Sequence, residues 1–158
     1  MFREMRRKNQ EISKQECIAI LSSEKRGVLA VLGDNGYPYA VPMNFYYDEQ
    51  NNKIYLHSAK SGHKLDSIQN CEKVCFTTWN QGIKKQNDWA FYVISVVIMG
   101  KAELVHDEKL KMQQIRNLGL KYYPSEQEVE EVIKKYINNM QLIAISIDNM
   151  TGKLVHEK

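Results

Sequence analysis

The chain has 158 residues, of which 43% are hydrophobic and 26% are charged, a composition typical of one globular domain. Its net charge of +3 is too small to indicate a nucleic-acid-binding face. The longest apolar run, residues 90–99, is far shorter than the roughly 20 residues that cross a membrane. We therefore expect a single domain over residues 1–158, with neither nucleic acid nor membrane as a partner.

The three cysteines, Cys17, Cys71 and Cys75, cannot all pair within one chain. A reducing compartment is their simplest setting, and no apolar secretory segment follows the charged N-terminus, so we expect a cytoplasmic protein. Cys71 and Cys75 are not spaced as a C-x-x-C pair, and no second cluster has zinc-finger spacing. We predict no metal site.

The first predicted helix begins at a capping box, in which Ser13 and Glu16 each bond the other's backbone, and it runs to about Ser23. An apolar run from Gly27 to Leu32 then indicates a strand. The turn residues Gly33–Gly36 follow it and indicate a hairpin.

The strand after this turn, from Tyr37 to about Tyr47, contains two prolines. Pro38 and Pro42 have no N–H to donate, so we expect an edge strand or an irregular strand. Backbone groups near Met43 and Asn44 would then be unpaired and free to bind a ligand.

Residues 57–64, with the sequence HSAKSGHK, join a predicted strand over 53–56 to a helix that begins near Lys64. Hydroxyls, two imidazoles and two ammonium groups therefore gather where a helix N-terminus offers free N–H groups. This composition predicts a phosphate-binding loop. The alternative is a solvated basic turn.

The remaining elements are a strand over 73–79, a polar loop over 80–88, an apolar stretch over 89–105 with a bulge at Gly100, helices over 107–120 and from the capping box at Ser125, and a strand over 142–147. Most of the strands are joined by hairpin-length connections, which indicates an antiparallel sheet. At this length a closed or split barrel removes the exposed sheet edges most simply.

Five segments in chain order carry a family resemblance: Arg6-Arg7-Lys8, Gly27–Val31, Gly36–Asn44, Tyr55–Lys64 and Thr151-Gly152-Lys153. They resemble the pyridoxamine 5′-phosphate oxidase-related flavin-binding proteins, specifically the nitroimidazole-resistance branch. The resemblance implies a mainly β fold, a six-stranded antiparallel FMN-binding split barrel with flanking helices. It also implies a homodimer with one FMN in each of two clefts between the subunits.

Carried over by position, the resemblance implies cofactor contacts from Pro42, Met43, Asn44, His57, Ser58, Ala59, His63, Lys64, Ser95 and Val96. Residues 42–44 would lie along the isoalloxazine ring and residues 57–59 beside the flavin, while Lys64, with His63, would hold the phosphate. Trp89 and Tyr92 would either close the cleft or pack in the core or dimer interface.

His57 is the catalytic candidate, because it ends a strand at the expected edge of the flavin, where an imidazole could donate a proton or contact a substrate. The alternative is that His57 only packs or caps the strand. No nucleophile with a base and an orienting acid is evident, as a hydrolase would need. A flavoprotein needs no such group, since the cofactor carries the electron transfer.

Three functions remain open. The favoured one is an FMN-dependent reductase of nitroimidazole-like or other small electrophiles, with electrons from NADH, NADPH or another donor. A non-catalytic flavin-binding or flavin-sequestering protein is the second. Oxidation of pyridoxamine phosphate is the third, but members with that activity end in a substrate-binding segment with arginine and histidine, whereas this chain ends in KLVHEK. A haem-handling role is weaker.

Overall fold

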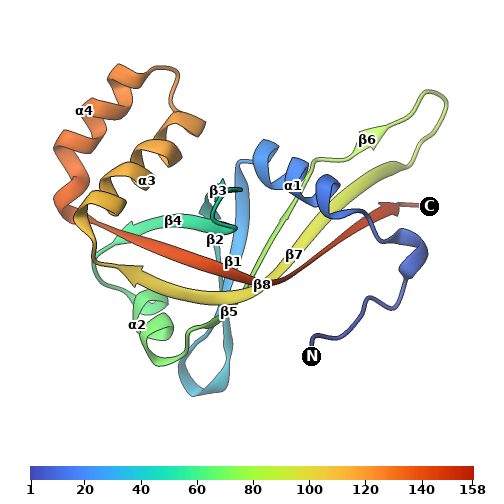
Figure 1. Cartoon of the computed structure of the whole chain (residues 1–158). Coiled ribbons are helices and arrows are strands. Elements are labelled where there is room, and N and C mark those ends of the chain that lie inside the picture. Colours follow the sequence, from blue (N-terminus) through green and yellow to red (C-terminus); the bar gives the residue numbers. More distant parts are fainter.

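Seven strands follow one another across a single antiparallel sheet in the order β2-β1-β5-β7-β8-β4-β3, and β6 pairs only with β7. The computed structural model describes all 158 residues. The strands are β1 (Arg26–Leu32), β2 (Pro38–Asn44), β3 (Tyr46–Asp48), β4 (Lys53–Ala59), β5 (Lys73–Trp79), β6 (Ile83–Lys84), β7 (Phe91–Val105) and β8 (Met140–His156). The helices are α1 (Lys14–Ser23), α2 (His63–Asn70), α3 (Glu108–Tyr122) and α4 (Glu126–Tyr136). Figure 1 shows the sheet curled, with the helices on its flanks.

The two edge strands, β2 and β3, are separated in the sequence only by Phe45. Seven strands laid flat would place the two edges on the order of 30 Å apart. One intervening residue spans no more than about 7 Å between the flanking Cα atoms. The sheet must therefore curl until its edges meet, and β2 does approach β4.

The predicted strand from Tyr37 to Tyr47 is broken at Phe45 and not at its prolines. Phe45 is fully buried, and its N–H donates a hydrogen bond to the Tyr122 hydroxyl at 2.8 Å. At this residue the chain stops pairing with β1 and starts pairing with β4. The prolines stay within β2 because it is an edge strand, as predicted.

Six of the strands have seven or more residues: β1, β2, β4, β5, β7 and β8. The predicted six-stranded split barrel with flanking helices is confirmed. The two additional strands are short, since β3 continues the chain of β2 and β6 is a two-residue strand inside the predicted polar loop.

The barrel core is filled by alternate side chains of the strands and by one face of α1. Leu29, Phe76 and Ile98 are fully buried there. The predicted capping box starts α1, because the Glu16 N–H donates to Ser13 Oγ and the Ser13 N–H donates to the Glu16 carboxylate. No helix is long and apolar enough to cross a membrane.

The longest ladder joins β7 to β8, and its register shifts between Met99 and Gly100. Asp148 of β8 is the extra residue, so the predicted irregularity at Gly100 is confirmed but the bulge lies on the opposite strand. A side chain at Gly100 would collide with the Ser146 carbonyl. The predicted strand over 142–147 is too short, since β8 continues to His156. The polar residues after the bulge interrupt the hydrophobic pattern that indicates a strand.

A second, smaller core lies on the other face of the sheet, beneath the hairpin formed by α3 and α4. Ile115 and Ile133 of the helices pack there with Leu142 and Ala144 of β8. Strand β8 is therefore buried on both faces over residues 142–145. Ile143 and Ile145 face the barrel core, while the residues between them are buried under the hairpin.

Candidate functional site

The end of β4 and the loop that follows it contain three buried polar atoms without a hydrogen-bond partner: His57 Nδ1, Ser58 Oγ and His63 Nε2. Ser58 is only 7% exposed and shares the barrel-facing side of β4 with Leu56. Buried polar groups are normally paired with protein, water or a ligand. These unpartnered atoms make the end of β4 and the start of α2 the candidate binding site.

The N-terminus of α2 lies beside these atoms and has no side-chain cap. Gly62 precedes the helix with a φ of +132°, a conformation that side chains rarely adopt, so glycine is needed there. The first N–H groups of α2 are therefore free, and Lys64 in the first turn adds a positive charge. Uncapped helix amides beside an ammonium group form a typical anion site.

His63 joins this helix N-terminus to the start of β2. Its ring stacks on Tyr39 at 4.2 Å between centroids, with an angle of 26° between the planes. Its Nε2 atom lies 3.5 Å from Asp34 Oδ2, an ion-pair contact without a hydrogen bond. Tyr39 and Asp34 had not been singled out from the sequence, although Tyr39 lies within the segment 36–44 that carries the resemblance.

The other predicted residues of β2 divide between its two faces. Met43 packs against the barrel core, whereas Pro42 and Asn44 are exposed. The last two line a hollow of about 570 Å³, together with Arg26 and Trp79. As β2 pairs only with β1, the backbone groups on its outer edge are available to a ligand.

Ser95 and Val96 of β7 point in opposite directions. Val96 is fully buried in the barrel core, so only its backbone could contact a cofactor. Ser95 lies opposite Trp79 in the β5–β7 ladder, on the outer face of the sheet. Trp89 is 71% exposed near the end of the β6–β7 arm, while Tyr92 stacks on His156.

His57 lies on the face of β4 away from the barrel, toward the α3–α4 hairpin. Burial lowers the pKa of His57, and the positive charge of Lys64 lowers it further. The imidazole is therefore neutral at pH 7. A neutral imidazole has one N–H donor and one acceptor nitrogen.

No group of three or more His, Cys, Asp or Glu side chains is arranged to hold a metal ion. Cys17 is buried, Cys71 and Cys75 are half-buried, and all three are free thiols. The site in this single chain is therefore made of hydroxyl, imidazole, ammonium and backbone groups. Tyr39 and the His63 ring that stacks on it lie near the start of β2, and the Pro42–Asn44 hollow lies toward its other end.

The family model for pyridoxamine 5′-phosphate oxidase matches residues 13–154. The chain belongs to this family. A provisionally named 5-nitroimidazole antibiotic resistance protein from Bacteroides thetaiotaomicron is 25% identical, with a TM-score of 0.77 over 93% of this chain and 87% of that protein. This likeness supports the predicted nitroimidazole-resistance branch.

Two further solved structures share the fold at lower identity. An FAD-binding protein from Mesorhizobium loti is 19% identical, with a TM-score of 0.69 over 92% of this chain and 97% of that one. The flavocytochrome Anf3 from Azotobacter vinelandii is 21% identical, with a TM-score of 0.78 over 96% of this chain and 72% of that one. No curated protein sequence matches the chain. The fold is thus that of the flavin-binding split barrels.

The lowered pKa of His57 makes a prediction for an NMR titration of the four histidines. The His57 midpoint should lie below 6.5. Lys64→Gln should raise this midpoint, because it removes the neighbouring positive charge, whereas Lys60→Gln in the exposed part of the loop should not. A midpoint at or above 6.5 in the wild type would contradict the burial of this ring.

The same shift gives the sign of a pH effect on stability. Below pH 6.5 the unfolded chain takes up a proton at His57 before the folded chain does, so acid favours unfolding. The contribution of His57 to the free energy of unfolding should fall as the pH drops through 6.5 toward the lowered value. Urea unfolding of wild type and His57→Gln between pH 7.5 and 5 measures this difference.

Proposed function

We propose that the protein binds FMN and acts as a reductase of small electrophiles such as nitroimidazoles. The observation that carries the proposal is the pair of unpartnered buried atoms Ser58 Oγ and His63 Nε2, beside Lys64 and the uncapped α2. These groups fit a phosphate and the polar chain attached to it. Electron transfer is the chemistry that bound FMN would supply.

The phosphate fits the N-terminus of α2, where backbone N–H groups and the Lys64 ammonium supply donors and positive charge. Ser58 would donate its unpartnered hydroxyl, and His63 is held on Tyr39 in a fixed orientation. A terminal phosphate monoester carries more charge than the diphosphate linkage of FAD at the same point. This favours FMN over FAD, and both over riboflavin.

The ring of the cofactor fits along β2. The exposed Pro42 and Asn44 line a hollow that also contains the flat side chain of Trp79. The unpaired outer edge of β2 offers backbone groups for hydrogen bonds to the polar edge of a flavin. His57, neutral and half-buried, would donate a hydrogen bond to the electrophile.

We also propose that the cofactor site is completed by a second copy of the chain. The outer face of β1, β5 and β7 carries large exposed apolar side chains, including Leu32, Trp79 and Met99. The helices α1 and α2 bury their apolar side chains in the barrel core, on the other side of these strands. Contiguous apolar faces of this kind are typical of obligate interfaces.

A non-catalytic flavin-binding protein would use the same residues. The two functions differ only in whether electrons pass on to a second molecule. Pyridoxamine phosphate oxidation is less well supported, because the C-terminal residues 151–156 are occupied in the β7–β8 ladder and end at His156 beside Tyr92. These residues are therefore not free to form a substrate-binding segment at the Lys64 site.

The phosphate anchor can be tested by titrating FMN into the flavin-free protein. Lys64→Ala should weaken FMN binding by about 1.5–3 kcal/mol, the contribution of a charge-assisted hydrogen bond. Lys60→Ala, in the same loop but exposed, should change it by less than about 0.5 kcal/mol. If the wild type binds riboflavin as tightly as FMN, the phosphate contributes nothing to binding and Lys64 is not its anchor.

The dimer can be tested by sedimentation at micromolar concentration, where a species of twice the 18.5 kDa chain mass is expected. Met99→Glu should shift the protein toward monomer and weaken flavin binding, since it places a charge on the apolar face. Met112→Glu, an equally exposed methionine on α3, should do neither. A monomeric wild type with bound FMN would rule out the shared site.

The reductase activity can be tested by stopped-flow absorbance under anaerobic conditions. The FMN-loaded protein, reduced with NADH or NADPH, should be reoxidised by a nitroimidazole. His57→Ala should slow this reoxidation by about a hundredfold, the lower end for loss of a hydrogen-bond donor to developing negative charge, and change FMN affinity by less than about tenfold. His106→Ala, an exposed histidine that follows β7, is the control.

The two possible failures of this experiment have different meanings. If the reduced wild type is not reoxidised, the protein is a flavin binder and not a reductase of these compounds. If wild type and His57→Ala react at the same rate, the reductase activity stands and His57 has no role in it.

A further inference from the structure

The register of the sheet places four side chains in a row across its outer face, near the start of β1. Arg26 of β1 pairs with Asn44 of β2, and Trp79 of β5 pairs with Ser95 of β7. The β1–β5 ladder, continued by one residue, brings Arg26 beside Trp79. Cβ atoms of directly opposed residues lie about 4.5–5.5 Å apart. One small ligand can therefore contact several members of this row, which we call the outer row.

Arg26 is the charged member of the outer row. It is exposed and forms no ion pair with any carboxylate. The hollow of about 570 Å³ that it shares with Asn44 and Trp79 has three charged residues in its lining, Glu24, Lys25 and Arg26. Two cations against one carboxylate leave this hollow positively charged, and such a cleft attracts anions.

Lys153 continues the outer row onto β8, where it lies opposite Ser95. It belongs to the segment 151–153 that carries part of the family resemblance. Its other neighbour is Glu11, which pairs with it in an isolated antiparallel bridge. Directly opposed residues place their side chains on the same face, so a carboxylate accompanies the Lys153 ammonium group. Both ladder neighbours of Arg26 are uncharged, which leaves Arg26 as the cation that is free to bind an anion.

Trp79 supplies a flat apolar surface next to this cation. Its side chain is 50% exposed, so one face of the indole is open to a stacking partner. A planar ring stacked on Trp79 would have the Arg26 guanidinium at its edge. A guanidinium group forms two parallel hydrogen bonds with a carboxylate. The two side chains together therefore fit an aromatic ring that carries a carboxylate.

We propose that the outer row binds an aromatic carboxylate, with the ring stacked on Trp79 and the carboxylate paired with Arg26. This names the substrate class of the reductase, and that consequence rests on the proposed function. The binding itself does not, because both side chains belong to the flavin-free chain. Strand β1 lies between β2, where the flavin ring is proposed, and β5, which carries Trp79. The two rings would lie side by side in one hollow, with Arg26 between them.

The test is calorimetric titration of the flavin-free protein with 4-nitrobenzoate and with 4-nitrobenzamide, an uncharged analogue of nearly the same shape. The wild type should bind 4-nitrobenzoate about tenfold more tightly, the contribution of one charge-assisted pair. Arg26→Gln should abolish this preference and leave the affinity for the amide unchanged. Added salt should reduce the preference in the wild type, because it screens the charge.

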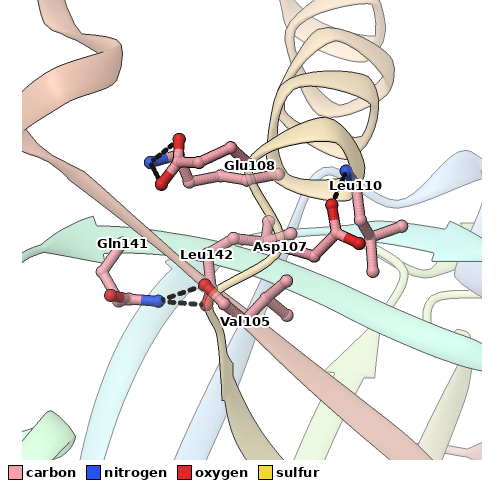
Figure 2. A network of polar contacts seen from close by, with 7 residues as sticks. Val105, Asp107, Glu108, Leu110, Gln141 and Leu142 are labelled. Atoms are coloured by element: carbon pink, nitrogen blue, oxygen red, sulfur yellow. Dashed lines mark hydrogen bonds and ion pairs between the residues drawn. The ribbon is translucent and has the colours of Figure 1, made fainter.

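Arg116→Gln is the matched control, since it removes the same charge from the α3–α4 hairpin. Arg116 pairs with Glu130 there, at 2.7 Å between Nε and Oε1, and does not line the hollow. Figure 2 shows that the base of the hairpin is held by the Gln141 amide, which donates to the carbonyls of Val105 and Leu142 at 2.9 Å each. The control variant should therefore keep its fold and both affinities.

Trp79→Leu separates the stacking from the charge. It should weaken the binding of both compounds by about fivefold and keep the preference for the carboxylate. Trp89→Leu changes the only other tryptophan, which is 71% exposed, and should alter neither affinity. Equal affinity of the wild type for the two compounds, or a preference that survives Arg26→Gln, would overturn the proposal.

Failure of this proposal differs from failure of the proposed function. If Lys64→Ala leaves FMN affinity unchanged, the cofactor proposal fails and the preference for 4-nitrobenzoate stands. If the FMN-loaded protein reduces both nitro compounds with the same KM, the reductase stands and the substrate class fails. If Arg26→Gln weakens FMN binding but keeps the preference between the two compounds, Arg26 serves the cofactor and the proposal is overturned.

Discussion

The fold depends on one constraint, which is that Phe45 alone connects the two edge strands of the sheet. β2 and β3 occupy opposite ends of the strand order, so the sheet can satisfy this connection only by curling into a barrel. Burial of the Phe45 ring against Phe76, at 5.0 Å between centroids, supplies the driving force at that point. The Tyr122 hydroxyl accepts the Phe45 N–H that would otherwise be unpaired.

This closure also creates the candidate site. When β2 approaches β4, its outer edge comes near the end of β4 and the N-terminus of α2. The stacking of His63 on Tyr39 is the direct contact between the two sides. The phosphate position proposed at α2 and the ring position proposed along β2 would therefore belong to one site, although 20 residues separate Lys64 from Asn44 in the sequence.

The α3–α4 hairpin connects the site to the rest of the molecule. Its foot is fixed by Gln141, and the end of α3 reaches Phe45 through Tyr122. Between these two points it covers the face of β4 that carries His57. One residue thus stands between two environments: the loop with Lys64, which supplies charge, and an apolar pocket, which removes water. This setting accounts for the lowered pKa of His57.

The amino-acid sequence by itself determined the local features. The capping box at Ser13, the N-cap at Ser125, the hairpin turn and the basic loop over 57–64 were all predicted, because each depends on residues within a few positions of one another. The split-barrel fold and its family also followed from short motifs in order. The break at Phe45 did not, since no local signal marks a residue whose conformation is set by a partner 77 positions away.

Only the tertiary structure decided which way each site residue points. Side chains along a strand alternate between two faces, and pairing and packing determine which face meets which neighbour. Val96 therefore lies in the core and Ser95 outside it, while Ser58 faces the barrel and His57 the hairpin. The residue types of the site could be identified from the sequence. The pocket beside His57, however, exists only because α3 and α4, which are distant in the sequence, fold over β4.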